Sequence, residues 1–300
     1  MEIYLPPTLD ITGALKVIQD VVNIDWTPKE QNIQFYFSDI KWVEPTGVTA
    51  FCNLIRWLQY HGVYTYFMES KRLRTECRPS IKYLDDAGFF NYFTSESLFK
   101  NSTCRQTTIP LMEIKLTNYI RWAQEKVIPW LDGRLDLRIE DQMPEFKTCL
   151  DEIFNNIEDH SGMDNGCSFA QHFPTKEKVV LSVSDFGVGI PYHVRGKYPD
   201  LSPKDAILVA TEEGFSTKEQ PAYRGSGLDT LIQNIVGSNH GRVEIYSWNG
   251  EVFCVSKNGA VHKEGRQLSA TYPGTLIELT LSTKSLMNAE SISGAFSWVL

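Results

Sequence analysis

The feature that most constrains the fold is an ordered series of three polar motifs in the C-terminal half, at residues 152–162, 185–190 and 224–228. The first contains a carboxylate and an amide one helical turn apart, the second an aspartate followed by two glycines, and the third two glycines at the start of a helix. Such groups can ligate a hard cation, accept a hydrogen bond from an exocyclic amine and approach phosphates closely. The series therefore predicts a binding site for ATP with magnesium.

The first motif lies on an expected amphipathic helix at residues 143–157, where apolar side chains recur at helical spacing. Glu152, Asn156 and His160 follow one another every four residues, so they share one stripe beside the apolar face. The carboxylate can activate a water, and the amide oxygen can ligate magnesium. The alternative is a solvated polar stripe, because Glu and Asn are mostly surface residues.

The second motif follows a stretch of alternating apolar and polar residues that predicts a half-buried strand at residues 178–185. The strand ends on Asp185, which can accept a hydrogen bond from an exocyclic amine. Gly187 and Gly189 leave no side chain between the backbone and a flat ring. The alternative is an ordinary strand-to-loop turn, since Asp and Gly are common in turns.

The third motif joins a polar segment to a helix expected at residues 228–236. The free amides of that helix N-terminus would point at an anion, and Lys218 and Arg224 can offset phosphate charge. Gly225 and Gly227 permit a close approach of the backbone. The alternative is a flexible surface loop before a glycine-rich helix start.

Two common nucleotide signatures are missing from the sequence. It contains no Gly-x-x-x-x-Gly-Lys-Ser/Thr, which excludes a P-loop. The Gly-x-Gly pairs at residues 187–189 and 225–227 both lack the third glycine of the dinucleotide fingerprint. A different class of nucleotide site is therefore expected.

The ordered motifs resemble the N, G1 and G2 boxes of the gyrase, histidine-kinase and MutL (GHKL) ATPase superfamily, and residues 272–281 are similar to its terminal Gly-Thr strand. The resemblance implies an α/β (α+β) fold, with a Bergerat-type sandwich that holds the nucleotide under a lid. It assigns the general base to Glu152, the magnesium ligand to Asn156 and adenine recognition to Asp185. The residues expected to contact the nucleotide are Asn156, Asp185, Gly187, Gly189, Ile190, Lys218, Arg224, Gly225, Ser226, Gly227, Leu228 and Thr275.

One branch of that family matches poorly. A sensor histidine kinase carries its phosphoacceptor histidine before the ATPase domain, but no histidine lies between His61 and His160. The spacing of Glu152, Asn156 and His160 is more similar to that of the serine kinases that act as anti-sigma factors. His160 is otherwise explained as a helix-terminal histidine favoured by the helix dipole.

The N-terminal hundred residues predict a small α/β domain built on a βαβ unit. Residues 32–38 and 63–68 are expected to form parallel strands, joined by a helix at residues 48–60. Residues 80–90 add a short helix that ends at a glycine.

This half resembles a STAS domain, the fold of anti-anti-sigma factors. Residues 44–48 correspond to the family's turn that carries the phosphorylated hydroxyl, which places Thr46 on the phosphoacceptor position. Pro45 replaces a polar residue of that turn. The alternative is that Thr46 only caps the helix, as threonines at strand-to-helix turns often do.

The expected organisation is a STAS-like domain at residues 1–98, a polar linker at residues 99–110 and a GHKL-type ATP-binding domain at residues 111–300. A helix expected at residues 111–131 leads into the second domain. It would either pack on the ATPase sheet or mediate dimerisation.

The composition limits the partners and the compartment. The net charge of -8 leaves no basic footprint, so nucleic acid is not expected to bind. The six scattered cysteines form no Cys-x-x-Cys pair, which indicates a reducing compartment. No apolar stretch is long enough to span a bilayer, so we expect a cytoplasmic protein without membrane contact.

Three functions remain open at this point. The ATPase half can phosphorylate a protein serine or threonine, drive a conformational switch by hydrolysis, or sense the nucleotide without turnover. The presence of both Glu152 and Asn156 argues against the last function. In each case ATP and magnesium are the expected ligands, a protein partner is expected at the STAS-like domain, and a homodimer is an alternative assembly.

Overall fold

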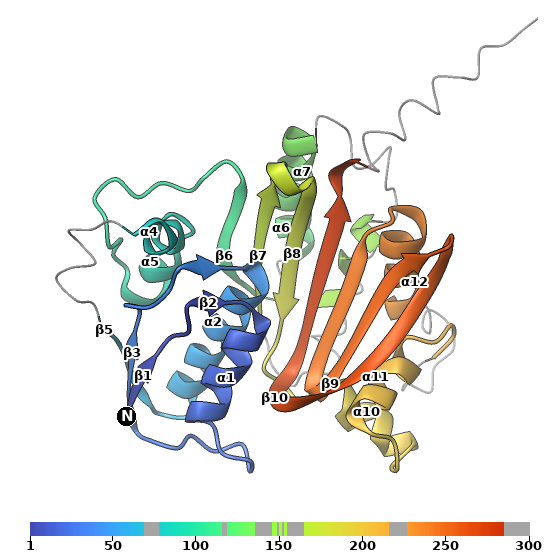
Figure 1. The fold of residues 1–300 in the computed structure, drawn as a ribbon, viewed down its shortest axis with the longest axis horizontal. Helices are drawn as coiled ribbons and strands as arrows, with labels where there is room; N and C mark the ends of the chain where they lie inside the picture. Colours follow the sequence, from blue (N-terminus) through green and yellow to red (C-terminus); the bar gives the residue numbers. More distant parts are fainter. Residues whose placement is uncertain are drawn as a thin grey trace, which may run out of the picture.

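The computed structural model describes residues 1–68, 78–115, 119–135, 146–148, 150–151, 153–154, 165–215 and 227–284. In these ranges the chain has two main sheets, with helices between them and on the far face of the larger one (Figure 1). The predicted α/β (α+β) class is therefore confirmed.

The N-terminal sheet is parallel, with the order β1 (Glu2–Tyr4), β3 (Asn32–Tyr36) and β5 (Tyr64–Met68). Helix α2 (Pro45–Tyr60) connects β3 to β5. The predicted βαβ unit is thus confirmed, and its helix begins three residues earlier than expected, with a proline in the first turn, where the missing N–H costs no hydrogen bond.

Helix α1 (Ile11–Val21) packs beside α2. Its N-cap is Asp10, whose carboxylate accepts a hydrogen bond from the backbone N–H of Gly13 at 2.8 Å. The short strands β2 (Thr8–Leu9) and β4 (Trp42–Val43) precede the two helices and pair in parallel, so both helices start at the same end of the molecule.

The single helix expected at residues 80–90 is two helices, α4 (Pro79–Asp86) and α5 (Phe89–Thr94). They are separated at Gly88, whose φ of +82° lies in the left-handed region. Glycine adopts this conformation without a steric penalty and commonly ends a helix there. The predicted end of the helix at a glycine is therefore confirmed, and the second helix, α5, was not predicted.

The larger sheet has the order β6-β7-β8-β10-β9, and every neighbouring pair is antiparallel. The predicted strand before Asp185 is confirmed as β8, but it is buried along almost its whole length, because helices cover both faces of the sheet. The five strands are β6 (Thr108–Lys115), β7 (Asn165–Phe173), β8 (Lys178–Ser184), β9 (Arg242–Lys257) and β10 (Ala260–Ser282).

The prediction of a helix at residues 111–131 is wrong for the first part of that range. Residues 111–115 belong to β6, because pairing with β7 satisfies their backbone groups and overrides the local spacing. The helix begins only at α6 (Tyr119–Trp122) and continues through the π-helical η2 (Ala123–Val127) into α7 (Ile128–Leu135).

One face of the large sheet carries the helix predicted at residues 143–157. The described positions between 146 and 154 are helical, and Phe146 and Phe154 are buried in the core on this face. None of the helices in the described ranges has both the length and the apolar composition needed to cross a bilayer. The other helices with residues in or against this core are α6, η2, α7, α10 (Ile190–Lys197), α11 (Pro203–Ala210), α12 (Gly227–Ile232) and η4 (Gln233–Ser238).

Helices α1 and α2 cover the opposite face of the large sheet, so they lie between the two sheets (Figure 1). One apolar core contains Phe51 and Leu58 of α2 together with Phe169 of β7 and Tyr272 of β10. The N-terminal and C-terminal halves therefore share a core. The division at residues 99–110 stays a prediction, and β6 begins within that range.

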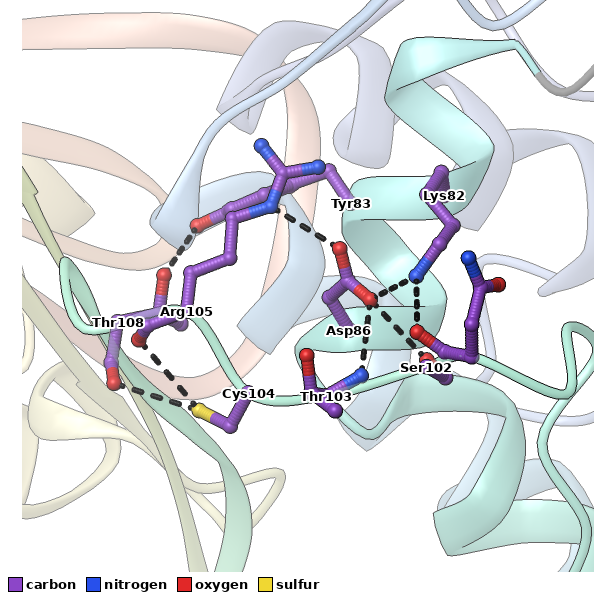
Figure 2. A network of polar contacts seen from close by, with 9 residues as sticks. Lys82, Tyr83, Asp86, Ser102, Thr103, Cys104, Arg105 and Thr108 are labelled. Atoms are coloured by element: carbon purple, nitrogen blue, oxygen red, sulfur yellow. Dashed lines mark hydrogen bonds and ion pairs between the residues drawn. The ribbon is translucent and has the colours of Figure 1, made fainter.

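Asp86, at the end of α4, fixes the polar segment that follows α5 (Figure 2). Burial by itself raises the pKa of Asp86, but its hydrogen-bond donors outweigh this effect and lower the pKa below its ordinary value. The segment expected as a linker is therefore bound to α4 through a charged group. The donors are the Lys82 ammonium, the Thr103 backbone N–H at 3.1 Å, the Ser102 hydroxyl at 3.2 Å and the Arg105 Nε at 3.0 Å.

Replacing Asp86 by Asn should lower the free energy of unfolding by about 2–3 kcal/mol, because the cationic donors lose their carboxylate. Because the folded-state pKa is lowered, this stabilisation should also disappear as the pH falls from 3.8 through the pKa of the folded state. Urea unfolding measures both effects.

The control is Glu125→Gln, which removes an exposed ion pair with Arg121 and should change the free energy of unfolding by less than about 0.5 kcal/mol. Equal unfolding midpoints for Asp86→Asn and the parent protein would contradict the role given to Asp86.

Candidate functional site

Asp185 lies directly after β8, and only 4% of its surface is exposed. Its backbone N–H donates to the carbonyl of Thr275 at 2.9 Å. Its carboxylate Oδ1 accepts from the backbone N–H of Gly187 at 2.7 Å. The structure thus brings together three of the predicted site residues from two segments that are far apart in the sequence.

Two glycines permit the close packing of this turn. Gly274 has a φ of +82°, and a Cβ there would lie 2.5 Å from the carbonyl oxygen of Asp185. Gly189 has a φ of +79°, and a Cβ there would lie 2.6 Å from the Ser247 hydroxyl. Both positions therefore require glycine. The space beside Gly189 is occupied by β9 and β10, whereas its expected role was to leave room for a ligand.

Ser247 and Trp248 of β9 hold the same turn, although neither is among the predicted site residues. The Ser247 hydroxyl accepts from the backbone N–H of Ile190 at 3.0 Å and donates to the carbonyl of Gly274 at 2.6 Å. The indole Nε1 of Trp248 donates to the carbonyl of Val188 at 2.8 Å. These contacts depend on how β9 pairs with β10, which no local pattern in the sequence reveals.

The buried carboxyl of Asp185 has an unusual protonation equilibrium. Burial raises its pKa to about 7, and the backbone N–H groups of Gly187 and Thr275 offset only part of that effect. Near neutral pH the carboxyl is therefore divided between its protonated and ionised forms. A ligand that donates a hydrogen bond to the ionised form would shift the equilibrium toward it.

The remaining predicted site residues are only partly described. Gly227 and Leu228 begin α12, and its Leu231 is buried in the same core as Phe146 and Phe154, on the face of the large sheet away from α1 and α2. Within the described ranges, no group of three or more His, Cys, Asp or Glu side chains is arranged to hold a metal ion. The predicted residues that lie outside the described ones are Glu152, Asn156, Lys218, Arg224, Gly225 and Ser226.

Thr46 lies in the first turn of α2 and is 1% exposed. The N-cap of this helix is Glu44, so the alternative that Thr46 caps the helix is wrong. Its hydroxyl donates instead to the carboxylate of Glu278 on β10. A kinase would reach the predicted phosphoacceptor only after α2 had separated from the large sheet.

No family model matches this chain, and no curated protein matches its sequence. The B-subunit of the DNA gyrase from Myxococcus xanthus is 19% identical, with a TM-score of 0.21, over 35% of this chain and 28% of that chain. The N-terminal domain of a DNA repair protein is 15% identical, with a TM-score of 0.18, over 39% of this chain and 31% of that chain. The aligned part spans about a third of the length of each, and similarities this low carry no argument about fold or function.

The raised pKa of Asp185 predicts a pH dependence of stability. Because the folded pKa of about 7 lies above the ordinary value of 3.8, the folded chain holds a proton that the unfolded chain has lost, so stability should decrease as the pH rises through that window. Between about pH 5 and pH 8 the loss should be on the order of 2–3 kcal/mol.

Urea unfolding at both pH values should show this loss in the parent protein and not in Asp185→Asn, whose amide does not titrate. Both proteins share all other titrating groups, so the difference between them isolates Asp185. The same pH dependence in both would show that the carboxyl titrates normally.

Proposed function

We propose that this chain binds ATP with magnesium at the end of β8 and that Asp185 accepts a hydrogen bond from the adenine amine. The observation that carries the proposal is the buried carboxyl itself, 4% exposed and with its pKa raised to about 7. Burying an ionisable group is costly, and buried groups with perturbed pKa values are concentrated at functional sites. A donor from a flat base would add a hydrogen bond to the ionised form and so favour it.

The geometry of the turn supports this assignment. The N–H of Gly187 holds Oδ1 of Asp185, and the carbonyl of Thr275 holds its backbone, so the carboxyl has a defined orientation before a ligand arrives. A preorganised acceptor loses little conformational freedom on binding. This order of Asp, Gly and Gly-Thr residues is also the one in which the sequence resembles the GHKL family.

The remaining groups complete the proposed site. The phosphates would lie toward the start of α12, near Gly227 and Leu228, with Lys218, Arg224, Gly225 and Ser226 on the segment before it. Asn156 would ligate magnesium, and Glu152 would polarise the attacking oxygen. Both residues fall in the helix predicted at residues 143–157, whose described Phe146 and Phe154 pack against the large sheet. Positioning and neutralisation of charge would supply most of the catalysis.

We further propose that the chain either hydrolyses ATP or transfers the γ-phosphate to a hydroxyl of a partner protein. The second reaction is the one that anti-sigma-factor kinases perform. Burial of Thr46 argues against this residue as an acceptor in the folded arrangement of its own chain. The competing function is an ATP-driven conformational switch, which the shared core between the two halves favours because a change at one half is transmitted by packing to the other.

Calorimetric titration tests the base assignment. ATP should bind about ten-fold or more weakly to Asp185→Asn, because a hydrogen bond to a charged group contributes roughly 1.5–3 kcal/mol. GTP should bind poorly to the parent, since its ring presents a carbonyl where adenine presents the amine. The matched control is Asp39→Asn, which removes one exposed carboxylate from the N-terminal half and should leave ATP affinity unchanged. Equal affinity for ATP and GTP would refute base recognition by Asp185.

Labelled γ-phosphate distinguishes the activities. The Glu152→Gln variant should retain ATP binding and lose turnover, whereas Asn156→Ala should lose binding that depends on magnesium. Label in free phosphate would identify an ATPase, and label in an added partner would identify a kinase. Unchanged turnover in Glu152→Gln would remove that residue from the chemistry.

A further inference from the structure

Asn53 of α2 contacts the end of β8, beside Asp185, from the face of the large sheet that α1 and α2 cover. Its side-chain amide donates to the hydroxyl of Ser184 and to the hydroxyl of Tyr272, the latter at 3.2 Å. The Tyr272 hydroxyl in turn donates to the backbone carbonyl of Asp185 at 3.2 Å. A continuous chain of hydrogen bonds therefore runs from an N-terminal helix to the backbone of Asp185.

An aromatic contact parallels this chain one helical turn later. The ring centroids of Trp57 and Phe186 are 6.1 Å apart, and those of Phe186 and Tyr272 are 5.2 Å apart, both in edge-to-face arrangements. Asn53 and Trp57 are four residues apart and lie on one face of α2. That face thus contacts Ser184 and Phe186, the two residues on either side of Asp185.

Other polar side chains of α2 make hydrogen bonds away from the turn at Asp185. The Thr49 hydroxyl donates to the carbonyl of Pro45 within the same helix at 2.7 Å, and Thr46 contacts Glu278. Asn53 is 8% exposed, Ser184 is 1% exposed and Tyr272 is fully buried. A buried amide is costly unless its hydrogen bonds are made, so this network favours one placement of α2 against β8 and β10.

We infer that α2 is a positioning element for the turn at Asp185, with Asn53 and Tyr272 as positioning residues. The inference rests on the proposed function of that turn and adds the N-terminal half to its support. Because Tyr272 bonds the Asp185 carbonyl, a shift of α2 changes how the turn presents its carboxyl to the base. Any partner that displaces α2 would therefore alter ATP affinity, and ATP would alter the affinity of that partner by the same factor.

Amide hydrogen exchange of the nucleotide-free protein tests the positioning role alone. Asn53→Ala and Tyr272→Phe should each speed exchange in the peptide covering residues 184–190, because both interrupt the same chain. The control is Thr49→Val. Thr49 is fully buried on the same helix, but its hydroxyl is bonded only within that helix, so this substitution should leave the exchange of that peptide unchanged. Tyr272→Phe removes one hydroxyl and conserves the ring, so it remains informative where Asn53→Ala does not fold.

Calorimetry with ATP and magnesium then tests the consequence. Each variant should bind ATP about five-fold more weakly than the parent protein. The double variant should lose less affinity than the product of the two single losses, since the effects of substitutions within one network are not additive. Unchanged exchange of the turn in Tyr272→Phe would overturn the inference, whether or not ATP binds. Faster exchange together with no ATP binding by the parent would uphold the positioning role and reject the proposed function. ATP binding by the parent that neither variant weakens would overturn the coupling.

Discussion

The packing of helix α2 between two sheets is the interaction on which the rest of the structure depends. Thirteen of its 16 residues are buried, so the helix is enclosed around most of its circumference. On one side Phe51 lies against Phe35 and Phe89, with ring centroids 5.1 and 5.7 Å apart. On the other side the helix meets β7 and β8. Neither sheet alone covers this helix, so we expect each half of the chain to be less stable without the other.

This enclosure has a consequence for the candidate site. Because α2 is held by the N-terminal sheet on one side, it presents a fixed surface to the back of β8 and β10. The turn after β8 is then supported from behind by α2 and from the side by Gly274, where two segments of the chain approach too closely for a Cβ atom. These contacts define the orientation of the buried Asp185 carboxyl, and a preorganised acceptor loses little conformational freedom when it binds a base.

The sequence predicts the elements that follow simple periodicity. The β3–α2–β5 unit and the described helical positions between Phe146 and Phe154 are found as expected, because their burial pattern is local. The strand β6 was missed, since its conformation is set by pairing with β7. The turn at Asp185 was identified, but Ser247 and Asn53 were not, because each acts through contacts with residues more than fifty positions away. The capping role considered for Thr46 was wrong for the same reason: its partner Glu278 is distant in sequence.

The central claim is that the Asp185 carboxyl binds the base of ATP. A crystal structure of the protein with a non-hydrolysable ATP analogue and magnesium tests it directly. The account predicts the exocyclic amine of adenine within hydrogen-bond distance of the Asp185 carboxylate, with Tyr272 still bonded to the carbonyl of the same residue behind it. A nucleotide bound elsewhere, or a base whose amine contacts groups other than Asp185, would contradict the account.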